Sequence, residues 1–537
     1  MYKYLILIFS VVLVVSCTTS SSSGNASLAG TISLLNSDDH SGVTVVLYNL
    51  AYLDTTLVRI NQEYPHIGVI ITQETEFDHR LQTPVKFTQT DLAGNFKLEG
   101  IRPGKYNLAL LKEGYSLKYV YNIHLSEGSN TLSTPNSKST SVSHCKELVD
   151  EAIFNSKLDN SSVVKNALNS SSVSSVANMF YLYPSVLIPP VVSIPITFQT
   201  GVQYNFPQNT IITAPVTIEP GTILAVGVNR KIDFHSTIST PETGIRWWLT
   251  SAHSINALPD LLENSKLDNV LFDRINILGT SQITLQNGKV SFLKDGLNIS
   301  PNNSIYTNIR AQHGFSHANV NSDNHTFSNV LVTDFSQRAH MFSGSSVIEK
   351  NIFYNNVENI LLSENEAIVQ NNYFHSNYVA VRPFYGSINI KNNNFENNDY
   401  SISTVASNPL IEYNNFYGSK TYCIQTHKHY IHAFYDYSNP VIKNNNLLGN
   451  NIMISLIARA NMFSGFSYLA SGGLGVRNNI DAISNFWKNT PVNDLIIDNT
   501  TYPNINNPQD SNFCPYLILY DPKRNAKVPN AGILRIF

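Results

Sequence analysis

An asparagine recurs at nearly constant spacing through the second half of the chain, and this repeat limits the folds open to the sequence. An apolar residue stands two places after most of these asparagines, as Phe353 and Phe374 do. The steps between successive asparagines are 18, 21, 21, 22, 21, 21, 21 and 31 residues, for Asn269, Asn287, Asn308, Asn329, Asn351, Asn372, Asn393, Asn414 and Asn445. A period of about 20–25 residues indicates stacked units, each too small to bury its apolar face alone. The sequence therefore predicts a solenoid.

The residues around each asparagine favour strands over helices. Val347-Ile348 and Ile368-Val369 are short β runs between polar turns, and a coil of about 21 residues has room for three strands of roughly 4–5 residues. Stacked Asn side chains can bond from coil to coil. We therefore expect a ladder of Asn308, Asn329, Asn351, Asn372, Asn393, Asn414 and Asn445. The pattern resembles the right-handed parallel β-helix proteins of the pectate-lyase-like superfamily, over about half of the chain.

The chain begins like an exported protein. Lys3 supplies a positive charge, and residues 5–15 form an apolar run too short to span a bilayer. The run ends at Cys17 in a sequence that resembles the lipobox of bacterial lipoproteins, which implies lipidation of Cys17 and attachment to a membrane. Thr18 follows, and the resemblance then favours the outer membrane of the cell envelope. The alternative is an ordinary secretory signal cut near Ser16. Residues 18–24 form a Ser/Thr tether.

Residues 25–134 have the alternating runs and Gly or Pro turns of a small antiparallel β-sandwich. Asp91, Gly94 and Phe96, followed by Pro103-Gly104-Lys105-Tyr106, resemble the carboxypeptidase-regulatory-like, or prealbumin-like, family. The resemblance implies a spacer or a binding module. Residues 51–85 interrupt the strands and are expected to form a solvated acidic loop rather than a metal site; their polar residues include Glu74, Glu76, Asp78 and His79.

The predicted fold class is therefore all-β, with a β-sandwich followed by a right-handed parallel β-helix. Residues 135–197 are assigned to a linker or a helix that caps the solenoid, residues 198–500 to the β-helix, and residues 501–537 to a C-terminal cap. Only 14% of residues are charged and the net charge is −3, which argues against nucleic acid as a partner. Cys145, Cys423 and Cys514 leave open one disulfide bond or three thiols.

Because stacked side chains fill the core of a β-helix, its chemistry must lie on an outward face or in the bends. Arg382 comes ten places after Asn372, which predicts that it faces solvent. The 22-residue step predicts one extra residue in the coil of Asn329, which would turn Arg338 and His340 to the same face. Asn359, Glu364 and Glu366 belong to the coil between them. Since coils stack about 4.8 Å apart, these groups would span roughly 10–15 Å, the length of a few sugar rings.

The 31-residue step adds ten residues to the coil of Asn414. The surplus falls at residues 426–437, which are rich in imidazoles and aromatic rings, and long loops in a regular array are usually functional. Aromatic rings can stack on sugars. We expect this segment to overhang the groove and to bind a polysaccharide through His427, His429, Tyr430 and Tyr435.

The sequence leaves catalysis open. The resemblance to polysaccharide lyases implies an Arg or Lys base beside calcium-binding carboxylates, which here would be Arg382 or Lys428 beside Glu364 and Glu366. Glycoside hydrolases of similar fold use Asp clusters, and the sequence has no acidic trio at a repeated offset. One hypothesis is a lipid-anchored envelope protein that binds a polysaccharide and cleaves it as a lyase or hydrolase. The other is a non-catalytic adhesin or structural rod.

Overall fold

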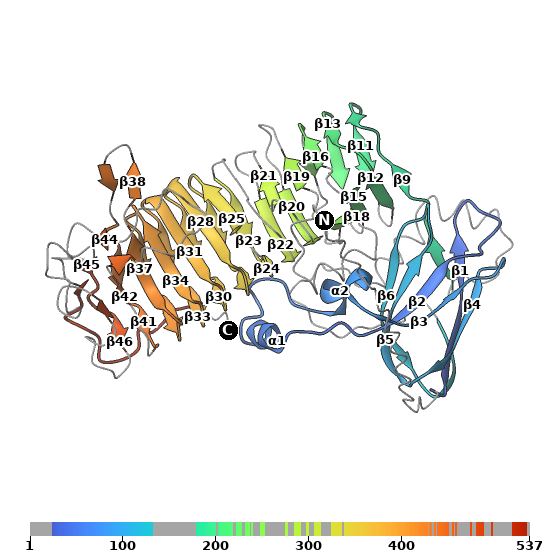
Figure 1. The fold of residues 1–537 in the computed structure, drawn as a ribbon, viewed down its shortest axis with the longest axis horizontal. Helices are drawn as coiled ribbons and strands as arrows, with labels where there is room; N and C mark the ends of the chain where they lie inside the picture. Colours follow the sequence, from blue (N-terminus) through green and yellow to red (C-terminus); the bar gives the residue numbers. More distant parts are fainter. Residues whose placement is uncertain are drawn as a thin grey trace, which may run out of the picture.

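The protein is elongated, with a β-sandwich at one end and a long stack of parallel strands extending from it (Figure 1). The computed structural model describes residues 24–132, 179–199, 202–218, 222–227, 231–236, 238–239, 247–252, 274–277, 284–291, 297–299, 305–312, 324–335, 338–427, 429–431, 434–436, 438–449, 454–455, 457–458, 473–474, 480–487, 496–497 and 518–533. The predicted all-β class is confirmed. No helix in these ranges is long and apolar enough to cross a membrane.

Two four-stranded sheets form the sandwich. One sheet is antiparallel and consists of β3 (Pro84–Gln89), β2 (Thr44–Asn49), β5 (Gly104–Leu111) and β6 (Lys118–Leu125). The other is mixed and consists of β4 (Asn95–Ile101), β1 (Ala26–Leu34), β7 (Gly128–Thr131) and β8 (Met179–Leu182). Apolar residues alternate along these strands, so that Leu28, Ile32, Val45 and Leu108 are buried in one core between the sheets.

The solenoid begins earlier than residue 198. Parallel pairing starts at β9 (Val186–Leu187), which pairs with β12 (Gln203–Phe206). The first coils continue through β10 (Val191–Val192), β11 (Ile196–Phe198), β13 (Thr210–Ile212), β14 (Val216–Ile218), β15 (Ile223–Gly227), β16 (Lys231–Phe234), β17 (Ile238–Ser239), β18 (Trp247–Ala252), β19 (Arg274–Ile277), β20 (Thr284–Ser291), β21 (Leu297–Ile299) and β22 (Ile305–Gln312). After β22, each regular coil has three strands, one in each of three sheets.

Sheet I contains β23 (Thr326–Ser328), β26 (Val347–Glu349), β29 (Ile368–Gln370), β32 (Asn389–Lys391), β35 (Leu410–Glu412), β40 (Val441–Lys443), β45 (Ile480–Asp481) and β48 (Ile518–Leu519). Sheet II contains β24 (Leu331–Thr333), β27 (Ile352–Tyr354), β30 (Tyr373–His375), β33 (Asn394–Glu396), β36 (Asn415–Tyr417), β41 (Asn446–Leu447) and β46 (Phe486–Trp487). Sheet III contains β25 (Arg338–Ser343), β28 (Glu358–Asn365), β31 (Val379–Gly386), β34 (Tyr400–Val405), β37 (Tyr422–His427), β42 (Ile454–Ser455) and β47 (Ile496–Ile497). Two hairpins, β38 (His429–Ile431) with β39 (Phe434–Asp436) and β43 (Ile457–Ala458) with β44 (Gly473–Leu474), complete the strands.

An asparagine ladder runs inside the corner between sheets I and II. The side-chain oxygen of Asn393 accepts from the backbone N–H of Asn372 at 2.9 Å and from its amide at 3.0 Å, while the Asn393 amide donates to the carbonyl of Val369 at 2.9 Å. The same bonds link Asn351, Asn372, Asn393, Asn414, Asn445 and Asn485. A second ladder of Asn356, Asn377 and Asn398 lines the corner between sheets II and III.

Asn308 and Asn329 do not belong to the ladder. Both have positive φ, 55° and 52°, and Asn329 lies one residue before Val330, whose N–H donates to Asn351. Asparagine tolerates this left-handed conformation, which Asn371 and Asn392 adopt in the corresponding turns of later coils. The step between equivalent positions is therefore 21 residues here also, and the extra residue expected in this coil is absent.

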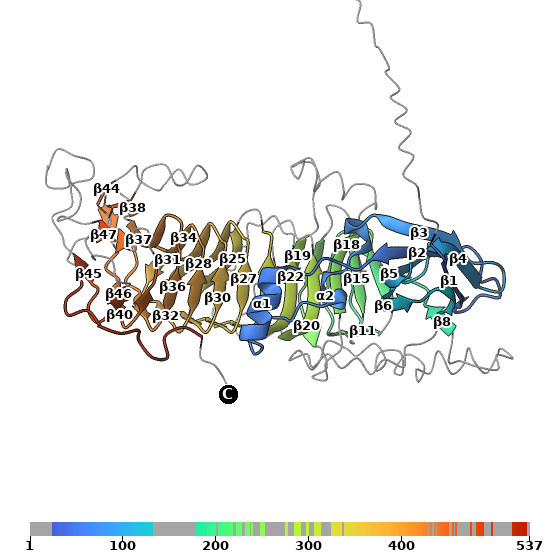
Figure 2. The same cartoon turned by 90° about the horizontal axis from the view of Figure 1, so that it is seen from below.

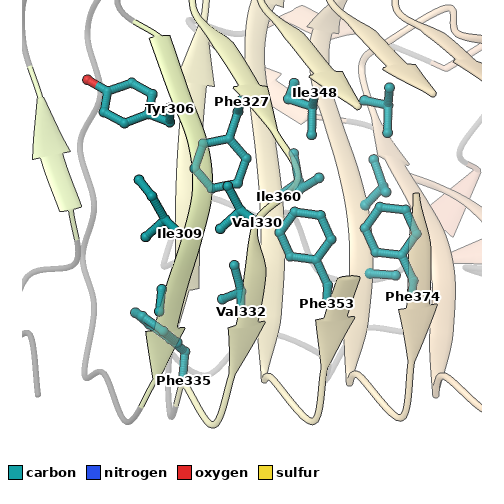
Figure 3. Close-up of a cluster of buried hydrophobic side chains, with 14 of the residues drawn as sticks. Tyr306, Ile309, Phe327, Val330, Val332, Phe335, Ile348, Phe353, Ile360 and Phe374 are labelled. Atoms are coloured by element: carbon teal, nitrogen blue, oxygen red, sulfur yellow. The ribbon is translucent and has the colours of Figure 1, made fainter. Parts of the chain in front are cut away.

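Aromatic rings stack beside the ladder in the core (Figure 3). The rings of Phe353, Phe374, Phe395 and Phe416 are nearly parallel, with centroids 4.9–5.0 Å apart. This spacing matches the rise from one coil to the next, so each ring packs directly on its neighbour. The thiol of Cys423 is fully buried in the same core and donates to the Ser419 hydroxyl at 3.2 Å; Cys145 and Cys514 lie outside the described residues.

The segment expected to be a solvated acidic loop is instead a folded arm that joins the two domains. The arm, residues 51–83, carries α1 (Thr55–Glu63), α2 (Gln73–Glu76) and the short 3₁₀ helix η1 (His79–Leu81). Figure 2 shows α1 lying against the side of the solenoid. Its apolar side chains pack on the outer face of sheet II, in a cluster of Leu57, Ile60, Tyr64, Ile67, Leu331, Ile352 and Tyr373.

Close approach and ion pairing hold the arm in place. Gly68 has a φ of 61°, and a Cβ atom there would lie 2.7 Å from the Ile352 side chain, so this contact requires glycine. Arg310 of β22, which is buried, donates to both carboxylate oxygens of Glu76 at 2.8 and 3.0 Å. Asp78 is also buried and pairs with Arg80 at 2.6 Å.

The end of the chain returns along sheet II to the arm. The N–H of Val528 donates to Asn446, the Asn415 amide donates to the carbonyl of Ala531, and the N–H of Gly532 donates to the carbonyl of Tyr413. Ile533 then joins the apolar cluster of the arm. The outer asparagines of sheet II therefore bind the backbone of this C-terminal tail.

Replacing one ladder residue should destabilise the solenoid strongly. Asn393→Ala removes the partners of several buried groups, and each unsatisfied group costs about 1–3 kcal/mol, so we expect a loss of about 3 kcal/mol. Asn392→Gly is the matched control because glycine accepts the positive φ there, and it should change stability by less than about 1 kcal/mol. Calorimetry would measure both, and equal melting temperatures for the two variants would contradict a stabilising ladder.

Candidate functional site

Two of the residues predicted to line a groove on sheet III, Arg382 and Asn359, are buried. Arg382 lies on β31 with only 3% of its surface exposed, so the prediction that it faces solvent is wrong. Its Nε is 3.1 Å from Oε1 of Glu358 on the preceding coil. A buried guanidinium paired with a carboxylate is costly to separate. A catalytic base must lose its proton and reach the substrate, and burial of Arg382 beside a carboxylate opposes both.

Asn359 is also misplaced by the sequence pattern. It is completely buried, between the register pairs Glu358–Val379 and Ile360–Val381, and Ile360 belongs to the core of the solenoid. Ala380 and Val381 of the next coil both belong to that core. Two successive core residues break the strict alternation of inward-facing and outward-facing side chains expected of a strand. Asn359 is therefore not exposed for binding a ligand.

The remaining predicted residues lie along sheet III and its hairpin. Arg338 is in register with Glu358 and His340 with Ile360, and His427 is in register with Val405. The surplus segment forms the β38–β39 hairpin, which carries His429, Tyr430 and Tyr435 and projects from the solenoid (Figure 1). The backbones of Arg338, His340, Glu364, His427, His429, Tyr430 and Tyr435 are described but their side chains are not, and Lys428 lies outside the described residues.

Of the two carboxylates expected to bind calcium, only Glu366 has a described side chain, and it is exposed. Among the described side chains, no three His, Cys, Asp or Glu residues are grouped closely enough to hold a metal ion.

Chemically active side chains gather instead on the neighbouring corner, between sheets II and III. The third residues of β27, β30, β33 and β36 point outward in register and form one row: Tyr354, His375, Glu396 and Tyr417. After the turn, a second row of partly exposed residues runs parallel to it: Val357, Tyr378, Asp399 and Lys420. We call these two rows the corner strip.

Glu396 is the centre of the strip. It accepts hydrogen bonds from the Tyr373 hydroxyl and from Nη2 of Arg59 on the arm, the latter at 2.8 Å. Nε2 of His375 lies 3.9 Å from the same carboxylate oxygen. Its Nδ1 is 2.8 Å from the Ser376 hydroxyl. With 21% of its side chain exposed, Glu396 remains accessible to a ligand.

The surroundings of this carboxylate determine its charge and that of its neighbours. Burial acts to raise the pKa of Glu396, but hydrogen bonds from Tyr373 and Arg59 outweigh it and the pKa is lowered. Burial lowers the pKa of His375, which keeps the imidazole neutral at pH 7, and burial raises the pKa of Tyr373. The ionised carboxylate of Glu396 therefore lies beside two buried neutral groups, the imidazole of His375 and the phenol of Tyr373, which is next to the strip.

The aromatic members of the strip are held by polar contacts. The hydroxyl of Tyr354 donates to Asp54 of the arm at 3.0 Å, and its ring lies 5.4 Å from that of His375. Tyr378 is 37% exposed and contacts Tyr400 edge to face. Lys420 pairs with Asp399 at 3.2 Å. The strip thus combines fixed rings with groups that can exchange hydrogen bonds with a ligand.

This row of side chains is not predicted above, although its pattern is present in the sequence. Each member stands three places after a ladder asparagine, so Tyr354, His375, Glu396 and Tyr417 follow Asn351, Asn372, Asn393 and Asn414. All four are polar or aromatic. The contributions of Arg59 and Asp54 had no such signal, because the arm comes about 300 residues earlier in the chain.

A match to one family model supports the fold of the solenoid. A family described as "Right handed beta helix region" matches residues 316–481. A search of curated proteins found no match. Similar solved structures include two variants of the catalytic domain of a GH87 alpha-1,3-glucanase in complex with tetrasaccharides, each 11% identical with TM-scores of 0.34 and 0.33, covering 93% of this chain and 89% of that chain. The catalytic unit of a thermostable GH87 alpha-1,3-glucanase from Streptomyces thermodiastaticus strain HF3-3 has a TM-score of 0.26 at 11% identity, covering 80% and 82%. Structural similarity this low carries no argument about the fold or the chemistry of this chain.

Stability should fall as the pH drops below about 6.5, partly through His375. An unfolded histidine binds its proton with a pKa near 6.5, while the folded pKa of His375 is lower, so protons favour the unfolded chain in acid. His375→Gln should make the melting temperature less sensitive to pH between 7 and 5, whereas His124→Gln, at an exposed position of β6, should not. Equal pH slopes for His375→Gln and the unmodified protein would show that His375 is not perturbed.

Proposed function

We propose that this protein is a lipid-anchored protein of the bacterial cell envelope whose β-helix binds a glycan along the corner strip. The observation that carries the proposal is the row of Tyr354, His375, Glu396 and Tyr417, repeated once per coil beside the exposed Tyr378. Four coils about 4.8 Å apart cover roughly 14 Å, which suits a segment of about three sugar rings.

The side chains of the strip are those that sugar recognition needs. The faces of tyrosine rings pack on the apolar faces of sugars, and charged groups form stronger hydrogen bonds with hydroxyls than neutral groups do. Glu396 is held in place by Arg59 and Tyr373, so little side-chain freedom is lost when a ligand binds. These properties support binding of a glycan. The activity measurement described below decides whether the protein also cleaves it.

Binding could extend to sheet III, which meets sheet II at the corner strip. Under this proposal Arg338, His340, His427, His429, Tyr430 and Tyr435 supply further contacts to a longer glycan. In the N-terminal half, Cys17 carries the lipid, residues 18–24 act as a tether, and the prealbumin-like sandwich acts as a spacer.

A second candidate function, a stiff structural rod or adhesin, is favoured by the arm. Apolar packing of Leu57 and Ile60 on sheet II and the buried Arg310–Glu76 pair fasten the sandwich to the solenoid. This contact restricts bending between the two domains. Such rigidity suits a structural rod that keeps two points at a fixed distance. Glycan binding distinguishes this function from the first.

Tyr378→Ala should weaken glycan binding about tenfold, since losing one stacking ring costs on the order of 1 kcal/mol or more. The full-length protein in mild detergent would be titrated with a panel of polysaccharides by calorimetry. New reducing ends and the ultraviolet absorbance of unsaturated uronates would be followed in the same samples to detect hydrolase or lyase activity.

Tyr413→Asn provides the matched control for this experiment. Tyr413 is 36% exposed, almost the same as Tyr378, but lies in the turn between sheets I and II, where asparagine fits the positive φ. The affinity of the Tyr413→Asn variant for the glycan should equal that of the unmodified protein. Failure of every glycan to bind would leave the rod as the better description, and equal losses in both variants would move the site away from the strip.

Cys17→Ala should abolish lipid attachment. Cells grown with a labelled fatty acid should incorporate label into the unmodified protein and not into the variant, which should leave the membrane fraction because several acyl chains are needed for firm anchoring. Ser16→Thr, next to the cleavage point, keeps the cysteine and should remain labelled. Label in the Cys17→Ala protein would rule out the proposed anchor.

A further inference from the structure

We infer that the glycan bound by the corner strip is uncharged. This inference rests on the proposed function, and it names the class of glycan that the strip would select. Three properties of the strip favour a neutral ligand: the charges around it, the carboxylate partners of its cations, and the hydrogen-bonding capacity of its carboxylates.

Carboxylates outnumber cations among the described side chains in and around the strip. Glu396 and Asp399 belong to the strip, Asp54 accepts from the hydroxyl of Tyr354, and Asp334 accepts from the amide of Asn355 in the adjoining turn. Glu63 lies 3.6 Å from Arg59. Against these five carboxylates stand Arg59 and Lys420, and His375 is neutral at pH 7, so the formal charge of this surface is −3.

Both cations already have carboxylate partners. Arg59 lies between Glu396, at 2.8 Å, and Glu63, and Lys420 is 3.2 Å from Asp399. A uronate would have to compete with these partners for a guanidinium or an ammonium group. It would also bring a negative charge to each ring in a field that is already negative, which slows and weakens association.

The carboxylates of the strip do not repel a neutral sugar. Their hydroxyl groups can donate hydrogen bonds, and an ionised carboxylate accepts such bonds with about twice the strength of a neutral acceptor. Asp54 accepts a hydrogen bond from the phenol of Tyr354 and Asp334 accepts one from the amide of Asn355, and these neutral donors leave the negative charge in place. The carboxylates that repel a uronate therefore serve as acceptors for an uncharged glycan.

The test compares neutral and acidic glycans of equal length. Full-length protein in mild detergent would be titrated with β-glucan, dextran and mannan oligosaccharides and with alginate and polygalacturonate oligosaccharides, at low and at high salt. We expect at least one neutral glycan to bind about tenfold or more tightly than either uronate at low salt, and the difference to narrow as salt screens the strip.

Charge substitution makes the test specific to the strip. Glu63→Lys combined with Asp399→Asn raises the net charge there by three units and should strengthen uronate binding several-fold at low salt while leaving the Glu396 contacts in place. Glu127→Lys combined with Glu113→Gln adds the same charge at exposed positions of the sandwich domain and should have no effect. Both variants have the same overall charge, so only position distinguishes them.

The outcomes separate this inference from the proposed function. Tighter binding of a uronate than of every neutral glycan in the unmodified protein would overturn the inference and keep the glycan-binding function. Equal responses of the two charge variants would overturn the role of the strip in selecting charge. If no glycan of either class binds, both the proposed function and the inference fail together.

Discussion

The solenoid depends on the hydrogen bonds of its buried asparagine side chains, whose amides donate to the asparagine oxygen of the next coil and to a backbone carbonyl of the preceding coil. The oxygen of Asn372, Asn393 or Asn414 accepts from the preceding coil, and its amide returns a bond to a carbonyl there. Because a buried amide without partners is costly, each ladder residue must stand at one height and in one register relative to its neighbours. That requirement sets the 21-residue coil, which in turn aligns the phenylalanine stack inside and the corner strip outside.

This dependence explains which parts of the molecule could be predicted. The ladder and Phe353 or Phe374 repeat within the chain, so their spacing reveals the coil without any knowledge of distant contacts. The repeat predicts Asn329 at the ladder position, but it lies one residue earlier, in the left-handed turn. Asparagine suits both positions, so the sequence cannot distinguish the two roles. Strict alternation along the strand predicts that Arg382 and Asn359 face solvent, but Ala380 and Val381 of β31 both belong to the core and Arg382 is buried beside Glu358 of the preceding coil.

The arm could not be foreseen for a different reason. Its apolar residues are spaced for a helix, but the surface that receives them, Leu331, Ile352 and Tyr373, lies on another domain. No local pattern encodes such a contact, and its polar residues made the segment resemble a solvated loop. The same long-range contact brings Arg59 to Glu396, so the charge of the corner strip depends on both domains. Any function of the strip is therefore tied to the docking of the arm.

The returning C-terminal tail has a consequence for the evolution of the repeat number. Arrays of identical coils commonly lengthen or shorten by duplication and deletion of whole units. Here the tail is fixed to coils near Asn446 and Asn415 and then reaches Ile533 in the cluster of α1. One additional coil between these points would separate them by a further 4.8 Å or so, about one and a half residues of extended chain. The length of the tail must therefore match the number of coils that it spans. A gain or loss of coils in this region would require a change in the tail at the same time.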